Sequence, residues 1–470
     1  MAALQSRLLM IFIIAKLGQL EWANQTTLHP VGVVTVVVLG LIMLFVPRKY
    51  AVIPMLIMAC FVAQAQRIVV MGLDFNLLRV LVIFGWIRVF TRSEMTSFTW
   101  KALDVVTLLW AFSSTISYTL LHASTAAFIN RLGFMFDAVG MYFLFRILVR
   151  DWNDLLAIIR ALAIISVPVA MAFLIERSTG RNMFSIFGGV PEITVIRQGK
   201  LRCQGAFSHP ILAGCFWASL LPMIAASYSS SVKWRMCSIV SLGACSLIIF
   251  ACASSTPMMA VAVACIGAAM WFLRHWMRWI CAGVLIVLVG LHLIMNAPVW
   301  HLISRIDLVG GSTGWHRYYL IDQAINRVGE WWLLGTTSTA HWGWGLADVT
   351  NQYVLESVRG GIATLTLFVL SLVIAFSNVG RIWRSMQNDH AKMVLGWSLG
   401  VALFVHTIVF LAVSYFGQIY VIWFLLLAII GSLTPTRKTR IASTALSTPL
   451  SRTRHSFANP PCVGISRSHS

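Results

Sequence analysis

Residues 360–378 read GGIATLTLFVLSLVIAFSN and contain no charged side chain. A helix needs about 20 mainly apolar residues to cross the hydrocarbon core of a bilayer, so this stretch predicts a transmembrane span. Similar runs recur along nearly the whole chain. The other candidate spans lie near residues 31–46, 51–69, 70–90, 102–121, 124–148, 153–174, 210–228, 235–253, 256–273, 278–296, 393–415 and 417–433.

The composition of the chain supports the same class of protein. Of the 470 residues, 59% are hydrophobic and 11% are charged. Soluble proteins average about 45–50% apolar and about 25% charged residues. The mean hydropathy of the chain is +0.83. These values exclude a soluble enzyme, a DNA-binding protein and a disulfide scaffold as descriptions of the whole chain.

The predicted fold is an all-α, polytopic helical bundle integral to the membrane, with about 12–14 transmembrane helices. The N-terminal stretch Leu8–Leu20 is apolar but short, and it reads as a further span, an interfacial helix or a signal-like segment. The predicted parts are N-terminal spans (1–174), a first external loop (175–209), central spans (210–296), a large external loop (297–359), C-terminal spans (360–433) and a tail (434–470).

Lysine and arginine gather at every second connection between the candidate spans. Arg48 and Lys49 follow the first span, and Arg381 and Arg384 follow the eleventh. Cytoplasmic loops are enriched in Lys and Arg, so these connections predict the cytoplasmic side. The tail 434–470 is rich in Ser, Thr and Arg and has no acidic residue, which predicts a disordered, basic cytoplasmic segment.

Two long connections, 175–209 and 297–359, fall on the opposite, external side and are also basic. Their basic residues are Arg177, Arg181, Arg197, Lys200, Arg202, Arg305, Arg317, Arg327 and Arg359. These side chains can be solvated loop charges or partners of nearby acidic residues. They can also form an anion site, and the predominance of arginine favours it because the guanidinium fork matches phosphate oxygens.

The second external loop is rich in aromatic residues. It contains five tryptophans between Trp315 and Trp344, and the apolar spacing over 315–328 predicts a helix along the membrane surface. Trp and Tyr are typical of the headgroup level, so the cluster reads as an aromatic belt. The same rings can stack on sugars, and the two interpretations are compatible.

Three groups of motifs follow one another in the second half of the chain. They are RQGKLRCQGAFSHPILAG at 197–214, with Gly205, His209 and Pro210; SSTP at 254–257; and STGWHRYY at 312–319, WLLG at 332–335, DVTNQY at 348–353 and GGIAT at 360–364. Their order, spacing and external placement resemble the O-antigen polymerase and O-antigen ligase superfamily of bacterial membrane proteins.

The ligase branch of that superfamily carries His, then Asn, Ser or Gln, nine residues, Gly, two residues, and Gly, Thr or Tyr. Asn351, Gly361 and Thr364 fall on this spacing, but Thr350 occupies the histidine position. The chain therefore looks more like the exopolysaccharide polymerases of the superfamily than like the ligases.

The resemblance implies a polymerase at the periplasmic face of the bacterial inner membrane. Such an enzyme joins polyprenyl-diphosphate-linked oligosaccharide repeats into exopolysaccharide or O-antigen. An O-antigen ligase that transfers the glycan to lipid A-core or protein is the alternative, and a polysaccharide flippase or transporter is the alternative from another class. The implied partners are the lipid-linked oligosaccharide, the lipid bilayer, and flippase, chain-length and export proteins, with no nucleic acid.

Glycosyl transfer from such a donor releases a lipid diphosphate, so negative charge develops where the bond breaks and needs a positive partner. The external loops contain no HExxH, no DxD and no clustered carboxylate pair. We therefore expect metal-independent chemistry without a cofactor. Arg202 and Arg317 are the first candidates to bind the diphosphate, followed by Arg197.

The acceptor hydroxyl needs a general base. With the family histidine replaced, the candidates are Asp348, Glu356 and His316, in that order of preference. Each has a structural alternative. Asp348 can cap the following helix, Glu356 can pair with Arg359, and His316 can support Arg317.

Arg131 and Asp137 lie inside the candidate span 124–148. A charge at mid-membrane costs about 2.5–3.5 kcal/mol on insertion scales, so Asp137 should face the interior of the bundle beside a partner. A transporter would be expected to show internal repeats, broken helices and charges near the midplane. The sequence shows no convincing internal repeat.

Overall fold

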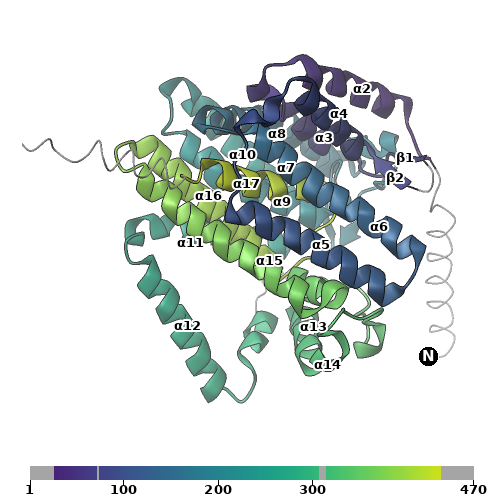
Figure 1. Cartoon of the computed structure of the whole chain (residues 1–470), viewed down its shortest axis with the longest axis vertical. Helices are drawn as coiled ribbons and strands as arrows, with labels where there is room; N and C mark the ends of the chain where they lie inside the picture. The colour runs from purple at the N-terminus through teal and green to yellow at the C-terminus, as the bar shows by residue number, and fades with distance from the viewer. Residues whose placement is uncertain (1–25, 71–72, 306–313, 436–470) are drawn as a thin grey trace, which may run out of the picture. The chain divides into compact units, whose positions relative to one another are not determined.

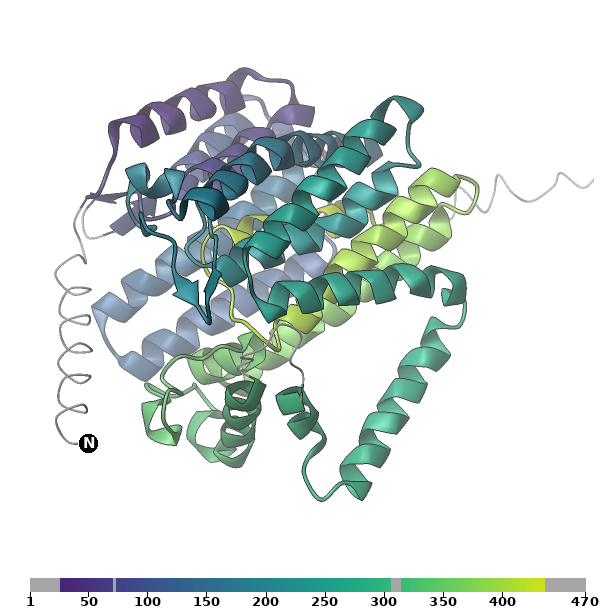
Figure 2. The same cartoon turned by 180° about the vertical axis from the view of Figure 1, so that it is seen from behind.

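The structure is a computed structural model and describes residues 26–70, 73–305 and 314–435. The stretch Leu8–Leu20 and nearly all of the predicted tail lie outside these residues. Helices dominate (Figures 1 and 2). They are α2 (Pro30–Phe45), α3 (Ile53–Phe61), α4 (Leu77–Thr91), α5 (Ala102–His122), α6 (Thr125–Met135), α7 (Met141–Leu148), α8 (Trp152–Thr179), α9 (Pro210–Ser227), α10 (Arg235–Ala251), α11 (Ser255–Ala269), α12 (Met277–Ile294), α13 (Gly314–Asn326), α14 (Val328–Trp331), α15 (Gln352–Ser385), α16 (His390–Val409) and α17 (Ile419–Leu433).

The remaining elements are short. The described part of the chain contains two antiparallel strand pairs, β1 (Arg67–Val70) with β2 (Leu73–Asn76) and β3 (Ile196–Arg197) with β4 (Lys200–Leu201). The π-helical turn η3 (Phe136–Gly140) joins α6 to α7. The 3-10 turns are η1 (Arg48–Tyr50), η2 (Glu94–Ser97), η4 (Met183–Phe187), η5 (Val232–Trp234), η6 (Met270–Leu273), η7 (Val299–Arg305) and η8 (Ala340–Trp342).

The chain is a polytopic helical membrane protein, as its hydropathy predicts. Within the described residues nine helices are long and apolar enough to cross a membrane, and α2 and α17 are shorter apolar helices. A helix also forms over Gly314–Asn326, close to the predicted surface helix at 315–328. The nine long helices are fewer than the 12–14 spans expected, partly because some predicted spans are short helices.

The prediction of a helical span at 51–69 is wrong. Helix α3 ends at Phe61, and the chain then enters the antiparallel pair β1–β2. Ile68, Val69 and Val70 favour an extended chain because β-branched side chains suit a pleated surface. Hydropathy averaged over the length of a span does not distinguish an apolar strand from an apolar helix.

Helix α15 is broken at Gly361, which has φ +69° and ψ −171°. A Cβ at this position would lie 2.2 Å from the carbonyl oxygen of Leu333. The backbone N–H of Ile362 donates to the carbonyl of Trp332 at 2.8 Å, so the crossing segment satisfies a group released by the break. Only glycine combines this backbone conformation with such a close approach.

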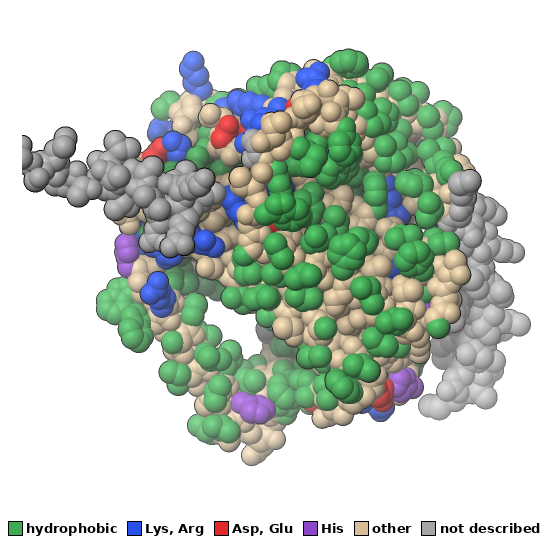
Figure 3. Space-filling view, in the orientation of Figure 1, with side chains coloured by type: hydrophobic (Ala, Val, Ile, Leu, Met, Phe, Trp, Pro, Cys, Tyr) green, Lys and Arg blue, Asp and Glu red, His purple; other side chains and the backbone are tan. Residues whose placement is uncertain are grey.

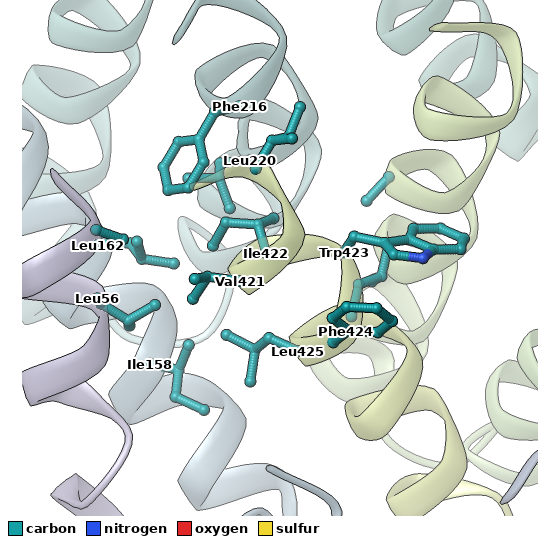
Figure 4. Close-up of a cluster of buried hydrophobic side chains, with 14 of the residues drawn as sticks. Leu56, Ile158, Leu162, Phe216, Leu220, Val421, Ile422, Trp423, Phe424 and Leu425 are labelled. Atoms are coloured by element: carbon teal, nitrogen blue, oxygen red, sulfur yellow. The ribbon is translucent and has the colours of Figure 1, made fainter. Parts of the chain in front are cut away.

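Helix α17 lies in the middle of the main hydrophobic core. Val421, Ile422 and Trp423 are almost fully buried, and Figure 4 shows Val421 and Ile422 on the side of Phe216 of α9 and Leu162 of α8, with Trp423 on the other side of α17. A helix that is apolar on all faces is typical of a buried position, and α17 follows this rule.

Helix α12 differs from the rest of the bundle because none of its residues is buried. Figures 1 and 2 show it standing apart from α11 and α15. In the space-filling view, hydrophobic side chains cover much of the middle of the face, and most of the visible Lys and Arg side chains gather toward the upper end (Figure 3). This distribution is typical of a surface that contacts lipid hydrocarbon between polar ends.

The two ends of the bundle use their charges differently. At the end that we call the basic end, carboxylates pair directly with arginines, as in Arg48–Asp154 at 2.5 Å and Arg146–Asp104 at 3.0 Å. The opposite end, the loop end, carries the β1–β2 pair, residues 180–209 and residues 314–351. Side chains tie these segments together there, since Gln66 donates to the carbonyl of Phe187.

The break in α15 leads to a stability prediction. Replacing Gly361 with Ala places a Cβ against a carbonyl oxygen in a backbone region that is nearly exclusive to glycine, so Gly361→Ala should destabilise the protein by about 1–3 kcal/mol. Thermal unfolding of the purified protein in detergent measures this. The matched control is Gly243→Ala in α10, where nothing lies within 4 Å of an added Cβ. Equal melting temperatures for the two variants would contradict the requirement for glycine at position 361.

Candidate functional site

The loop that follows α8 is folded around the carboxylate of Glu176, which is 1% exposed. One carboxylate oxygen accepts hydrogen bonds from the hydroxyl of Thr194 and the backbone N–H of Gln204, both at 3.0 Å. The other accepts from the backbone N–H of Gly205 at 2.9 Å. The loop therefore returns to the end of the helix from which it starts.

Gly205 fits this return because it has no side chain. Its φ is +56°, and a Cβ would lie 2.5 Å from the ring of Phe173. The carbonyl of Gly205 accepts a hydrogen bond from the side-chain amide of Asn182 at 2.8 Å. The glycine of the 197–214 motif thus has a clear structural role.

The β3–β4 hairpin positions two of the predicted arginines. Its turn residues Gln198 and Gly199 have φ values of +53° and +71°, the two positive values that a type I′ hairpin turn requires. Arg197 lies on β3 and Arg202 directly follows β4. The backbone N–H of Cys203 then donates to the carbonyl of Ala251, which ties the hairpin to the end of α10.

Arg202 is buried, with 8% of its surface exposed. Its Nε has no hydrogen-bond partner among the described residues. Burial, followed by the charge of Arg197, lowers the pKa of Arg202. A buried guanidinium with an unsatisfied N–H is costly, so this position favours an anion.

Arg317 reaches the same region from α13. Its Nε donates to the carbonyl of Ala412 at 3.1 Å, and its Nη2 donates to the hydroxyl of Thr256 at 2.9 Å. Burial and the charge of Arg197 lower the pKa of Arg317 as well. Cys203, next to Arg202, is bound to the end of α10, and Arg317 is bound to Thr256 at the start of α11. Both predicted diphosphate ligands therefore lie by the α10–α11 turn, and the charge of Arg197 acts on both.

His209 completes this group at the start of α9. It is the N-cap residue, and its Nδ1 accepts the backbone N–H of Ile211 at 3.1 Å. Burial, then the charges of Arg202 and Arg197, lower the pKa of His209 to about 4. The imidazole is therefore neutral near pH 7, and it caps the helix that Pro210 begins.

We refer to Arg197, Arg202, Arg317 and His209 as the arginine site. Within the described residues none of its arginines forms an ion pair with a carboxylate. Thr256, in the first turn of α11, adds a hydroxyl and a second helix N-terminus beside that of α9. Guanidinium groups and helix N-termini without acidic partners make a binding site for an anion such as phosphate.

The structure does not place the three candidate bases in this group. Asp348 is exposed, and the cap of α15 is Asn351, whose Oδ1 accepts the N–H of Val354 at 3.1 Å. His316 is half-buried, and its Cε1 lies 3.6 Å from the position of a Cβ on Gly345. The backbone N–H of Asp348 contacts the carbonyl of Gly345 at 3.4 Å. Asp348 and His316 therefore flank one turn.

Glu356 lies in a separate, buried group. Its carboxylate accepts hydrogen bonds from the indole N–H of Trp110 at 2.9 Å and from the side-chain amide of Gln352 at 2.7 Å. It interacts with the charges of Arg131 and Arg359 without a direct ion pair to either among the described residues. Both of its oxygens are engaged, which favours a structural position.

The expectation that Asp137 has a partner is confirmed. Arg79 of α4 donates two hydrogen bonds to its carboxylate, from Nε at 2.7 Å and from Nη2 at 2.6 Å. Such a bidentate pair offsets much of the cost of burying the two charges.

Sequence reasoning missed the parts that Glu176 and Thr256 take in this region. Glu176 is one of the acidic residues near the first basic loop, but its partners are a threonine hydroxyl and two backbone N–H groups, which no composition reveals. Thr256 belongs to the SSTP motif, and its position just before an apolar run was a usable signal for a hydroxyl at a helix N-terminus. Among the described residues no group of three or more His, Cys, Asp or Glu side chains is placed to hold a metal ion.

Comparison with known proteins identifies no relative: no protein family matches the chain, and no curated protein matches it.

The lowered pKa of His209 leads to a pH prediction. The unfolded chain takes up a proton near the ordinary histidine pKa of about 6.5, whereas folded His209 does so only near pH 4. Between about pH 6.5 and about pH 4 the unfolded state therefore binds more protons than the folded state. This contribution to stability is present above pH 6.5 and is lost as the pH falls from 6.5 toward 4.

His209→Asn keeps a good helix cap but removes the titration. Between pH 7 and pH 5 the melting temperature in detergent should fall more for the wild type than for His209→Asn. Parallel profiles would contradict the burial of a neutral imidazole.

Proposed function

We propose that the chain is a membrane glycosyltransferase that joins polyprenyl-diphosphate-linked oligosaccharide repeats, with the arginine site binding the diphosphate. The observation that carries the proposal is the position of Arg202 and Arg317 by the α10–α11 turn, with no carboxylate partner among the described residues. The motifs at 197–214, 254–257 and 312–364 that resemble the polymerase and ligase superfamily supply elements of this site.

In the proposed reaction the acceptor hydroxyl oxygen forms a bond to C1 of the donor sugar. The bond between C1 and the diphosphate oxygen breaks, and the electron pair leaves with the lipid diphosphate. The hydroxyl proton passes to a base. Guanidinium groups stabilise the charge that develops on the leaving diphosphate, a metal-independent role in which preorganised donors contribute most.

Asp348 is the preferred base in this proposal, with His316 beside the same turn as its neighbour. The Asp348 carboxylate is exposed and accepts no hydrogen bond from the described residues, so it can take a proton from an incoming hydroxyl. Glu356 is the weaker candidate because two donors already occupy its oxygens.

Polymerase is preferred over ligase because of Thr350. This residue stands where the ligase branch has histidine, and its hydroxyl is buried without a partner among the described residues. A threonine hydroxyl is a poor base, so a mechanism that depends on a base at this position loses its key group.

Transport of a lipid-linked glycan is the second candidate. The ion pair between Arg79 and Asp137 and the break of α15 at Gly361 favour it. Charged residues within spans and discontinuous helices are typical of transporters. The same features also suit an enzyme that positions its substrate between broken helices, so the assay below includes a transport arm.

The proposal predicts the effect of removing single guanidinium groups. A charge-assisted hydrogen bond contributes about 1.5–3 kcal/mol, so Arg202→Gln and Arg317→Gln should each lower the rate about 10- to 100-fold. The assay incubates the purified full-length protein with a lipid-diphosphate oligosaccharide and follows lipid-linked glycan length. The matched control is Arg327→Gln, since Arg327 is half-exposed and paired with Glu330 at 3.0 Å.

The products distinguish the candidates. Longer lipid-linked glycans support the polymerase, whereas transfer only to added lipid A-core indicates a ligase. Movement of the substrate across liposomes without a new bond indicates a transporter. Wild-type rates in both Arg202→Gln and Arg317→Gln would contradict the role of the arginine site.

A further inference from the structure

A second polar feature of the loop end is a pocket of about 300 Å³ beside the β1–β2 pair. Its lining residues come from the segment between α3 and β1, the β1–β2 pair, the start of α4 and the loop between α8 and α9. They are Gln64, Ala65, Arg67, Asp74, Asn76, Arg79, Gly189 and Ser208. All but Ala65 and Gly189 have polar side chains, so the pocket does not suit an apolar tail. Its volume lies at the lower end of the range for small-molecule sites.

The charges of this pocket are balanced, unlike those of the arginine site. Arg67 pairs with Asp74 at 3.1 Å, and Arg79 pairs with Asp137 at 2.6 Å. Each arginine of the pocket therefore already has a carboxylate. A phosphate here would compete with these carboxylates, whereas a neutral ligand meets donors and acceptors together.

Several hydrogen-bonding groups of the pocket have no protein partner within the described chain. Neither the amide of Gln64 nor the hydroxyl of Ser208 makes a side-chain hydrogen bond there. Asn76 uses its Oδ1 to cap α4 and keeps its amide donors. The side chain of Asp74 is 45% exposed. Mixed donors and acceptors of this kind complement the adjacent hydroxyl groups of a sugar, each of which both donates and accepts.

The pocket adjoins the arginine site. Ser208 lines it, and the next residue, His209, belongs to the arginine site. The connection between α16 and α17 also borders both sites. The carbonyl of Ala412 binds Arg317, while a Cβ on Gly417 would lie 2.6 Å from Oε1 of Gln64 and 3.4 Å from Oγ of Ser208.

We infer that this pocket is a saccharide subsite that holds a neutral sugar residue of the glycan while the arginine site holds the diphosphate. The choice of a sugar over other neutral polar ligands rests on the proposed function. The separation of roles follows from the charges: unpaired guanidinium groups bind the anion, and the balanced pocket next to them binds the uncharged part of the same substrate class.

The test uses the full-length protein in lipid nanodiscs and two kinds of probe. The first is a panel of immobilised neutral hexose and N-acetylhexosamine oligosaccharides without phosphate, and the second is inorganic pyrophosphate in solution. Gln64→Ala and Ser208→Ala remove single hydrogen-bonding groups from partly exposed positions, so neither should prevent folding. Asp74→Asn removes a charge, and its matched control is Glu192→Gln, which removes the exposed partner of Arg181 on the same end.

The wild type should retain at least one neutral glycan. Each of Gln64→Ala and Ser208→Ala should weaken that binding about 5- to 10-fold, the loss expected for one hydrogen bond, with pyrophosphate binding unchanged. Arg202→Gln should weaken pyrophosphate binding and leave glycan binding unchanged. Glu192→Gln should match the wild type for both probes. Retention of no glycan, or wild-type glycan binding in both pocket variants, would overturn the inference.

The two proposals fail in different ways. If the wild type binds a glycan through the pocket but does not bind pyrophosphate, the subsite stands and the diphosphate role of the arginine site is wrong. If pyrophosphate binds and depends on Arg202 while the pocket variants retain full glycan binding, the subsite is wrong and the arginine site stands.

Discussion

The arrangement of the loop end depends on the hydrogen bonds that the buried carboxylate of Glu176 accepts. A buried carboxylate commonly pairs with a cation, but this one accepts hydrogen bonds from Thr194, Gln204 and Gly205. Two consequences follow. The loop is held against the end of α8, and Cys203, next to Arg202, is bound to the end of α10. The Glu176 carboxylate is also occupied by neutral donors, and it forms no ion pair with Arg202 among the described residues.

The pocket and the arginine site differ in the partners of their arginines, which are carboxylates in the pocket and neutral acceptors in the arginine site. In the pocket each arginine has a carboxylate at ion-pair distance, as with Arg79 and Asp137. In the arginine site the carbonyl of Ala412 and the hydroxyl of Thr256 accept from Arg317 instead. Neutral acceptors orient a guanidinium without cancelling its charge. An arginine held in this way is preorganised for an anion, and little reorganisation is needed when charge develops.

Hydropathy predicted most of the helices because each long span is a continuous apolar run, whose side chains lie either in the core or against lipid. It failed at 51–69, where α3 ends at Phe61 and the chain continues into β1, and it did not reveal the break at Gly361. The break depends on the segment at Leu333, which is distant in sequence and close in space. Averages along the chain contain no information about such a contact.

Residue type was enough to propose candidate anion-binding residues, and their role stays a prediction. Arg197, Arg202 and Arg317 were candidates because they lie in the two long basic loops, where the enrichment of Lys and Arg in cytoplasmic loops does not explain the positive charge. The bases could not be separated in the same way, since the position of Asp348, Glu356 or His316 depends on how the large loop folds over the bundle. Glu356, for example, lies against Trp110 of a helix far from it in sequence.

The segment 410–418 connects these observations, because irregular backbone among spanning helices requires internal hydrogen-bond partners. The carbonyl of Phe410 accepts from the backbone of Gln352, that of Leu411 from Asn351, and that of Ala412 from Arg317. Hydrogen-bond donors at the starts of α15 and α13 thus pair with the carbonyl groups of one stretch of non-helical chain. Removing any of these donors would leave a carbonyl unpaired, so the groups that shape the arginine site are also groups that the fold requires. Function and stability therefore cannot be separated by mutating Arg317 alone, and Arg202, which donates no side-chain hydrogen bond among the described residues, is the more direct probe of anion binding.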